Sequence, residues 1–93
     1  MDILIKQEDT KGYAIAMEND QKAGMMTFSI TGPNLIIIDH TEVEPAFQGK
    51  MVGKQMLYKV VEMARNKETK IIPLCPFAAA MFKKISEIRD VLK

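Results

Sequence analysis

The sequence predicts an α+β fold built on a mixed β-sheet, and three patterns along the chain support this prediction. Residues 1–43 alternate apolar and polar side chains between turn signals, which is typical of an antiparallel meander of four strands. A long amphipathic helical pattern follows, and then a short apolar run and a second helical pattern. The fourth strand, the first helix and the fifth strand therefore form a right-handed crossover, which makes the fifth strand parallel to the fourth.

The four strands of the meander are expected at residues 3–7, 13–17, 23–30 and 35–43. Polar turns separate them, and residues 31–34 (Thr-Gly-Pro-Asn) end the third strand with a clear turn signal. In the third strand, Met26, Phe28 and Ile30 share one face because side chains alternate along a strand. The fourth strand begins with a continuous apolar run, which predicts burial on both faces near the centre of the sheet.

The second half of the chain changes to a helical period. A first helix is expected at residues 52–67, where apolar side chains recur on one side and charged side chains occupy the opposite side. Residues 71–74 form the expected fifth strand, and Pro73 within it indicates an edge position because proline lacks a backbone N–H. A second helix is expected at residues 78–85, and residues 86–93 fit either a last helical turn or a short strand.

The composition limits the class of protein. The chain has 93 residues, which is the size of one domain, and its 47% hydrophobic and 27% charged residues are typical of a globular rather than a disordered protein. Thirteen basic and twelve acidic side chains give a net charge of +1, so no bulk attraction to nucleic acid or to an acidic membrane is expected. A single cysteine excludes an intrachain disulfide and a multi-cysteine zinc site, and no metal is expected.

The sequence also indicates where the protein is located. No run of about 18 apolar residues occurs, so no membrane-spanning helix is expected. The N-terminus alternates and carries charge early, without the basic start and apolar core of a signal peptide. The single cysteine fits a reducing compartment, and the cytoplasm is the expected location.

The segment between the fourth strand and the first helix, residues 44–54, has the features of an anion site. It contains two glycines and two lysines, and a helix begins inside it. Unpaired N–H groups and the helix dipole attract anions at a helix start, and Lys50 and Lys54 add positive charge. Gln55 follows Lys54, so the segment does not match a P-loop, and the G-x-G-x-x-G pattern of dinucleotide sites is also absent. A solvated strand-to-helix turn is the alternative interpretation.

The same segment resembles part of a known family. Residues 47–54 (Phe-Gln-Gly-Lys-Met-Val-Gly-Lys) resemble the acetyl-CoA-binding motif R/Q-x-x-G-x-G/A of the GNAT acetyltransferases. Residues 39–43 (Asp-His-Thr-Glu-Val) and 71–78 (Ile-Ile-Pro-Leu-Cys-Pro-Phe-Ala) are similar to a subfamily of small GNAT-like proteins with a His-Thr strand and a Cys-Pro-Phe segment. The resemblance extends over residues 36–84. It implies a GNAT-like mixed sheet in a single acetyl-CoA-binding domain of residues 1–93.

The resemblance also implies where acetyl-CoA binds. The pyrophosphate would lie on the N–H groups of residues 48–53, in which Met51 stands where the motif has its middle glycine. The pantetheine arm would lie between the fourth and fifth strands and bond to the backbone near Glu42 and Val43. The Val43 N–H would stabilise the developing oxyanion of the acetyl carbonyl. The implied cofactor-binding residues are Glu42, Val43, Gln48, Gly49, Lys50, Met51, Val52, Gly53, Lys54 and Phe77.

His40 and Cys75 are the candidate catalytic residues, and they are the only histidine and cysteine of the chain. They lie near the ends of the two parallel strands, which is expected to place both in one region beside the implied thioester. A Cys75 thiolate stabilised by His40 would accept the acetyl group, or His40 would deprotonate the incoming amine. Direct attack of the amine on acetyl-CoA, the usual route in the GNAT family, is the favoured version. Structural roles for both residues are the alternatives.

Two classes of function follow from these patterns. The first is an enzyme, an N-acetyltransferase that uses acetyl-CoA as co-substrate and transfers the acetyl group to an unidentified amine. Asp39 and Glu42, at the same strand end, either receive a cationic amine or are solvated. The second class is a non-catalytic module with a GNAT-like fold that binds acyl-CoA or a protein partner, and a degenerate fold that has lost the ligand is a third interpretation. No nucleic acid or membrane partner is expected, and the sequence does not set the oligomeric state.

Overall fold

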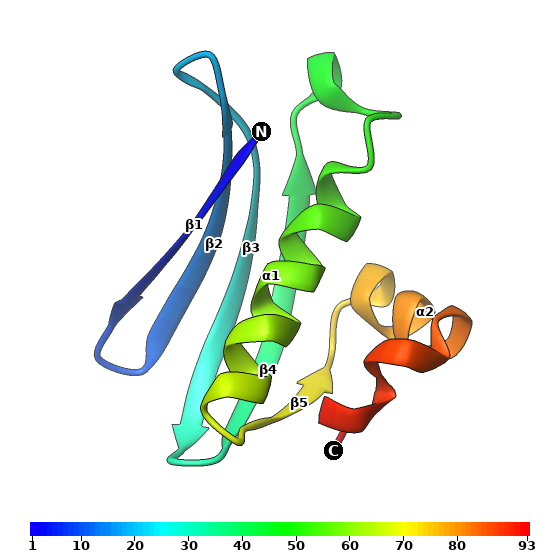
Figure 1. Ribbon diagram of the computed structural model, residues 1–93. Coiled ribbons are helices and arrows are strands. Elements are labelled where there is room, and N and C mark those ends of the chain that lie inside the picture. The colour runs from blue at the N-terminus through cyan, green and yellow to red at the C-terminus, as the bar shows by residue number, and fades with distance from the viewer.

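The computed structural model describes residues 1–93 and contains one five-stranded mixed sheet (Figure 1). The first four strands are antiparallel neighbours, and the fifth is parallel to the fourth. The predicted α+β fold, with a meander and a parallel crossover, is confirmed. In the order in which they lie in the sheet, the strands are β1 (Asp2–Glu8), β2 (Lys11–Glu18), β3 (Gln21–Gly32), β4 (Leu35–Val43) and β5 (Lys70–Pro73).

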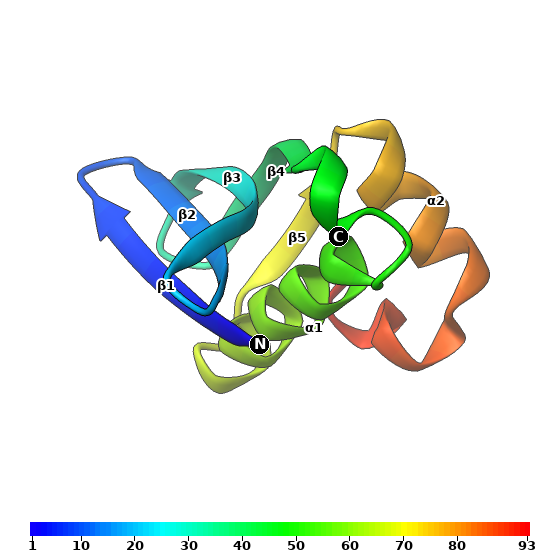
Figure 2. The same cartoon turned by 90° about the horizontal axis from the view of Figure 1, so that it is seen from above.

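The helical segments follow β4 and β5. Figure 2 shows α1 on one side of the curved sheet and α2 beside β5. The short segment η1 was not expected from the sequence, and Leu92 after η2 forms an isolated bridge with Ile71, so that residues 86–93 contain both a helical turn and a strand contact. None of the helices combines the length and the apolar character that crossing a bilayer requires. The segments are η1 (Pro45–Phe47), α1 (Val52–Asn66), α2 (Pro76–Lys84) and η2 (Ser86–Val91).

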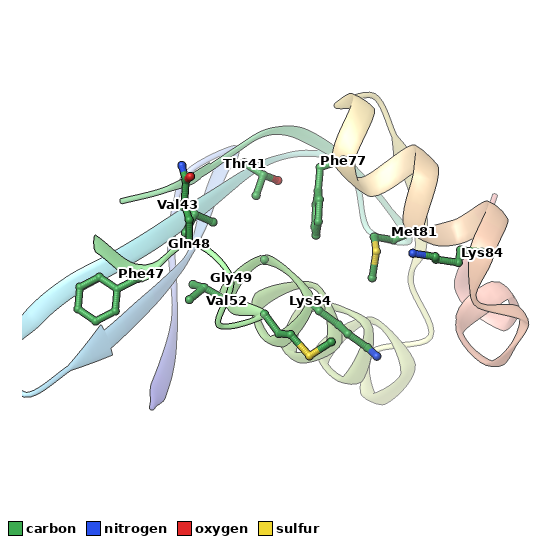
Figure 3. Close-up of a pocket in the computed structure, with 12 residues that line it drawn as sticks. Thr41, Val43, Phe47, Gln48, Gly49, Val52, Lys54, Phe77, Met81 and Lys84 are labelled. Carbon is green, nitrogen blue, oxygen red and sulfur yellow. The ribbon is translucent and has the colours of Figure 1, made fainter. Parts of the chain in front are cut away.

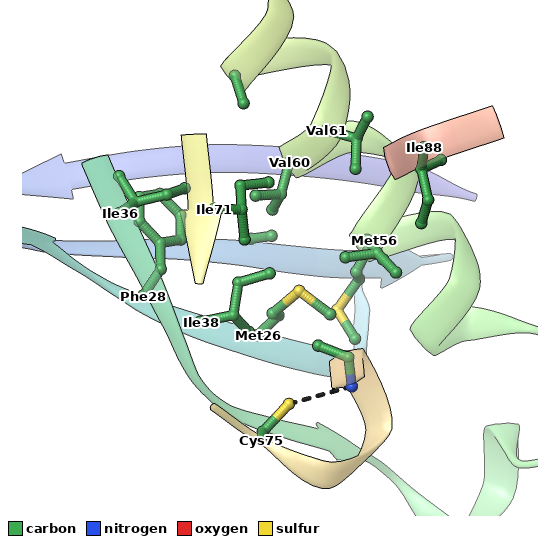
Figure 4. Close-up of a cluster of buried hydrophobic side chains, with 14 of the residues drawn as sticks. Met26, Phe28, Ile36, Ile38, Met56, Val60, Val61, Ile71, Cys75 and Ile88 are labelled. Carbon is green, nitrogen blue, oxygen red and sulfur yellow. Dashed lines mark hydrogen bonds between the residues drawn. The ribbon is translucent and has the colours of Figure 1, made fainter. Parts of the chain in front are cut away.

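The hydrophobic core lies between the helices and one face of the sheet (Figure 4). Met26, Phe28 and Ile38 on the strands are fully buried there. Full burial of one such side chain contributes about 1.5–3 kcal/mol, so this face is a main source of stability. The helix α1 contributes an apolar stripe at helical spacing, which consists of Val52, Met56, Leu57, Val60, Val61 and Ala64.

The expected burial of both faces of β4 is wrong. Ile36 and Ile38 are buried against the helices, with exposed fractions of 4% and 0%. Ile37 points to the opposite face and is only half-buried, because α1 and α2 pack against the other side (Figure 2). We call this uncovered side the outer face of the sheet.

β4 has two strand neighbours along only half of its length. β5 pairs with residues 35–38 and ends at Pro73, so it is the edge strand that the proline predicted. The N–H groups of Leu74 and Cys75 both donate to the Ile38 carbonyl oxygen, at 3.0 and 3.2 Å, and the chain then turns into α2. Beyond Ile38, no strand lies on the β5 side of β4. The sheet is therefore open along the second half of this strand.

A β-bulge lies at the same point. The pairing register between β3 and β4 skips Asp39, which is an extra residue in β4. An extra residue shifts the alternation of side chains by one position. After the bulge, Thr41 and Val43 face the helix side, whereas His40 and Glu42 are exposed on the outer face.

An ion pair ties the C-terminal segment to α1. Arg65 of α1 donates two hydrogen bonds to the Asp90 carboxylate, at 2.7 and 2.8 Å, and a third to the Glu87 carbonyl oxygen at 2.7 Å. The hydrogen bonds from Arg65 lower the pKa of the Asp90 carboxyl from its usual 3.8, and they raise the pKa of the Arg65 guanidinium. The segment η2 is thereby held against α1.

Candidate functional site

A cleft of about 520 Å³ lies where β4 loses its second neighbour (Figure 3). Its walls are the end of β4, the connection from η1 to α1, and one side of α2. This volume falls within the range of cofactor sites, about 300–1,000 Å³. The lining residues are Thr41, Val43, Phe47, Gln48, Gly49, Met51, Val52, Gly53, Lys54, Phe77, Met81 and Lys84.

The backbone N–H groups from Gly49 to Lys54 have no backbone acceptor in the protein. The first hydrogen bond at this end of α1 runs from the Gln55 N–H to the Met51 carbonyl oxygen, at 3.0 Å, and no side chain caps the helix. Unpaired donors at a helix start, together with the helix dipole, favour a bound anion. This is the arrangement of the anion site that the sequence predicts for residues 44–54.

Two residues of this turn have a left-handed backbone. Gly49 has a φ of +85°, and Met51 has a φ of 60° and a ψ of 31°. Glycine is favoured at such angles because it has no Cβ to collide with the backbone, so the Met51 position suits the glycine of the GNAT-type motif. The Met51 side chain is 65% exposed and lies at the rim of the cleft.

Gly53, in the first turn of α1, gives space to an aromatic ring of α2. A Cβ atom at Gly53 would lie 2.7 Å from Cζ of Phe77, a separation that packed carbon atoms do not adopt. Figure 3 shows the Phe77 ring pointing from α2 into the cleft. The second glycine of the motif thus permits close packing of α2 on the helix start.

The charge and polarity of the lining also suit an elongated anion. Lys54 on α1 and Lys84 on α2 are its charged side chains, and no carboxylate lines the cleft. Phe77 and Met81 form an apolar wall on α2. The two lysines attract negative charge to the cleft, while Phe77 and Met81 suit an apolar chain.

The open half of β4 presents backbone groups to the cleft. The Glu44 N–H donates to the Ala23 carbonyl oxygen of β3, at 2.8 Å. Backbone groups alternate in direction along a strand, so those of Val43 and Thr41 point away from β3. No strand pairs with them there. A ligand in the cleft can form hydrogen bonds with this edge.

Cys75 lies behind the wall of the cleft, and its exposed fraction is 5%. It is the N-cap residue of α2, where its Sγ accepts a hydrogen bond from the Ala78 N–H at 3.4 Å (Figure 4). The same sulfur lies 3.3 Å from Oγ1 of Thr41, which lines the cleft. The thiol therefore has a visible structural role, and Thr41 connects it to the cleft.

His40 does not lie beside Cys75. The bulge at Asp39 directs the imidazole to the outer face, where Nε2 lies 3.1 Å from Oε1 of Glu42. The sequence predicts that His40 and Cys75 share one region because both lie near the ends of parallel strands, but it does not reveal the bulge. The structure instead pairs Cys75 with Thr41 and His40 with Glu42.

Most residues that the sequence assigns to cofactor binding line the cleft, and two do not. Glu42 is on the outer face, and the Lys50 Nζ lies 5.4 Å from the centre of the Phe47 ring, outside the lining. The residues that sequence reasoning missed are Thr41, Phe47, Met81 and Lys84. For Thr41, Met81 and Lys84, the sequence contains a pattern that predicts their position. Thr41 lies two positions before Val43 in a strand, and Met81 and Lys84 follow Phe77 at helical spacing.

The sheet that opens along the second half of β4, with a helix start beside the opening, defines an α+β protein with a cleft suited to an elongated anion. Comparison with known families is more specific. The family model described as GCN5-related N-acetyl-transferase matches residues 12–91, and the chain belongs to this family. The GNAT membership predicted from residues 36–84 is thereby confirmed, as is the predicted class of activity, acetyl-CoA-dependent N-acetylation with an unassigned acceptor.

Solved structures agree with this assignment. The "GCN5-like putative N-acetyltransferase" of Staphylococcus aureus, determined in solution by NMR, is 39% identical to this chain, with a TM-score of 0.67. The match covers 97% of this chain and 87% of that one. No curated protein matches the chain significantly.

More distant structures share the fold alone. The ribosomal-protein-alanine N-acetyltransferase of Brucella melitensis biovar Abortus 2308 is 16% identical, with a TM-score of 0.70 over 84% of this chain. A "predicted acetyltransferase" of Clostridium acetobutylicum, solved with acetyl-CoA, is 22% identical, with a TM-score of 0.63 over 81% of this chain. The chain spans 62% and 56% of the lengths of these two proteins.

Proposed function

We propose that the chain binds acetyl-CoA in the cleft and transfers the acetyl group to a primary amine. One observation carries this proposal: the unpaired N–H groups from Gly49 to Lys54 lie next to the open edge of β4. A diphosphate needs such donors, and an amide-containing arm needs such a strand edge. The acetyl-CoA complex of the Clostridium acetobutylicum protein, which shares the fold, is consistent with it.

The proposal assigns each part of acetyl-CoA to a region of the cleft. The diphosphate would lie on the amides of the helix start, with Lys54 and Lys84 as cationic neighbours. The pantetheine arm would lie along the open half of β4, against Phe77 and Met81. The proposal requires the Met51 side chain, which is 65% exposed, to stay clear of the diphosphate.

The strand edge also supplies the stabilisation that acetyl transfer requires. When an amine attacks the acetyl carbon, negative charge develops on the carbonyl oxygen. The Val43 N–H, which points to the open side of β4, is proposed to donate to that oxygen. Loss of one such donor typically costs about 10²–10³ in kcat.

Direct attack by the amine remains the favoured route. Cys75 is buried and accepts the Ala78 N–H, which is the role of a helix cap. Cys75→Ser keeps a capping side chain, whereas Cys75→Ala removes it at a cost of about 0.5–2 kcal/mol. If the thiol carries the acetyl group, both variants lose turnover. If it only caps α2, Cys75→Ser is active and as stable as the wild type.

We also infer the setting of the reaction. Residues 1–93 are proposed to act as one acetyl-CoA-binding domain, without a metal and without a nucleic acid or membrane partner. The cytoplasm is the proposed location, because the lone cysteine suits a reducing compartment. Location of the tagged full chain in its host cell tests this part of the proposal.

Calorimetric titration with acetyl-CoA tests the binding step. We expect saturable binding by the wild type and weaker binding by Lys84→Gln, which removes a cationic lining residue. Lys83→Gln is the matched control, because its side chain is exposed on the same helix and does not line the cleft. Absence of binding by a protein with a native circular dichroism spectrum would overturn the proposal.

The second candidate function is passive binding of acyl-CoA. It is favoured by one observation, the separation of His40 from Cys75, which leaves no paired catalytic dyad in the cleft. Release of free CoA thiol from bound acetyl-CoA distinguishes the two functions. Steady release that depends on an added amine excludes passive binding, and release at the buffer rate with every amine supports it.

A further inference from the structure

The outer face carries a second group of chemically active side chains at the open half of β4. His40 and Glu42 project from it, and their side chains are 62% and 56% exposed. The imidazole Nε2 lies 3.1 Å from a Glu42 carboxylate oxygen. Thr41 and Val43 alternate with this pair and line the cleft on the helix side. This segment of β4, which pairs with β3 but not with β5, therefore presents a cationic cleft on one side and a His–Glu pair on the other.

These two sides suit the two substrates of a transfer reaction. Acetyl-CoA in the cleft would place its thioester at the open edge of β4 and fill the helix side, so the acceptor must come from the outer face. The geometry points to the His40–Glu42 pair as the acceptor site, which takes a primary ammonium group on an unbranched alkyl arm. This inference rests on the proposed function.

The Glu42 carboxylate is the group available to bind a cation at this site. Asp39, its neighbour on the same strand, accepts a hydrogen bond from Ser29 at 2.7 Å and lies 3.4 Å from Lys11 Nζ. Both contacts are made by Oδ2, and the Asp39 charge is already paired with a cation, Lys11. Glu42 contacts only His40, through one oxygen, and its other oxygen is free to accept an ammonium N–H.

Leu74 supplies an apolar surface on the opposite side of the gap. It follows β5 directly, and its N–H donates to the Ile38 carbonyl oxygen, at the point where β4 and β5 separate. Leu74 is 64% exposed and precedes the buried Cys75, so it faces away from the core. An exposed apolar side chain where the two strands separate suits an alkyl arm that ends in an ammonium group. A lysine side chain of a peptide and a free alkyl diamine share this chemistry.

The changes of bonds and protons balance without a further reactant. The ammonium group gives one proton to His40, which Glu42 orients. The nitrogen lone pair forms the C–N bond with the acetyl carbon, the C–S bond breaks, and its electron pair remains on sulfur. The nitrogen loses a second proton and sulfur takes up one. The proton on His40 passes to water, so each turnover releases one proton.

NMR spectroscopy tests the binding step directly. Because His40 is the only histidine, its ring C–H signals identify the site. With CoA present, cadaverine or a lysine peptide with a blocked N-terminus should shift these signals in the wild type. The shift should be lost in Glu42→Gln, and tetramethylammonium, which has no N–H to donate, should cause none. Comparison of the two amines distinguishes a free diamine from a peptide as the source, and no shift with either overturns the inference.

Turnover with the same amines tests the chemical step. Release of free CoA thiol should fall about 10²-fold or more in His40→Ala, and added imidazole should restore part of it. Glu42→Gln should raise KM for the amine more than it lowers kcat. Lys6→Gln changes an exposed charge on β1, at the far edge of the sheet, and should have no effect. Wild-type turnover in His40→Ala overturns the inference.

Acetyl-CoA binding by each variant distinguishes a failure of the proposed function from a failure of the acceptor-site inference. Both outer-face variants should bind acetyl-CoA as the wild type does, because neither residue lines the cleft. If the wild type binds no acetyl-CoA, the proposed function fails and the inference fails with it. If binding is normal and the variants react like the wild type, only the inference fails.

Discussion

The two halves of β4 differ sharply although they belong to one strand. Residues 35–38 pair with β3 and β5 and bury Ile36 and Ile38 in the core. Residues 39–43 pair with β3 alone, begin with a bulge, and expose His40 and Glu42. The first half stabilises the fold, whereas the second half supplies unpaired backbone groups and accessible side chains.

The two halves show how one strand can line a cleft with one face and expose side chains on the other. The loss of one strand neighbour opens the sheet, and one extra residue in the strand redirects the side chains after it. Two faces of the same segment become accessible as a result. The following predictions test the division between the halves, from the largest expected effect to the smallest.

Truncation of one side chain in each half of β4 should give the largest difference, measured as the free energy of unfolding. Ile38→Ala should lower the free energy of unfolding by about 2–5 kcal/mol, because the side chain is fully buried. Val43→Ala should cost about 1 kcal/mol or less, because Val43 is only half-buried and keeps its backbone N–H. Urea unfolding followed by circular dichroism measures both. Equal losses would contradict the division.

Gly53→Ala should damage the cleft more than the fold. The added methyl group would force the Phe77 ring away from the first turn of α1. We expect affinity for acetyl-CoA to fall about tenfold, which corresponds to about 1.4 kcal/mol. Gly32→Ala is the matched control, since nothing lies within 4 Å of a Cβ there. Calorimetry on both variants checks this, and equal affinities would show that Phe77 adjusts freely.

Met51→Gly should affect stability and leave binding unchanged. A left-handed backbone is unfavourable for methionine and not for glycine, so the variant should gain about 0.5–1 kcal/mol of stability. Acetyl-CoA affinity should not change, because the Met51 side chain is 65% exposed. Thermal unfolding and calorimetry measure the two effects. A large gain in affinity would mean that this side chain obstructs the site.

The Arg65–Asp90 pair, which lies outside β4, should make the stability of the fold depend slightly on pH. The pKa of Asp90 is lowered in the folded protein, so its carboxylate contributes stability above pH 3.8, the usual pKa of this group. That contribution is lost as the pH falls through the lowered pKa. Asp90→Asn should flatten the acid limb of the stability curve, as measured by urea unfolding at a series of pH values. An unchanged limb would show that the exposed pair does not stabilise the fold.

The regular elements were predictable because their periods are local properties of the sequence. Alternation located the strands of the meander, and the helical spacing of apolar residues located α1 to within one residue at its end. The predicted burial of both faces of β4 is wrong because isoleucine occurs both in the core and on the uncovered face of the sheet. Side-chain identity alone does not show which helices cover a face.

The candidate site was predictable in part for the same reason. The glycines and lysines of residues 44–54 are a local pattern, and the structure places most of them at the cleft. The partners of His40 and Cys75 depend on the bulge at Asp39, which arises from pairing between β3 and β4. Pairing register depends on residues far apart in the sequence, so no local pattern predicts it.

The uncapped start of α1 has a consequence for amide hydrogen exchange. Amide protons without an acceptor exchange with solvent readily, and those from Gly49 to Lys54 have none within the backbone. The first turn of this helix should therefore exchange its amides faster than the interior turns that follow. A bound diphosphate would slow that exchange at these positions, so hydrogen–deuterium exchange would reveal occupancy of the site residue by residue.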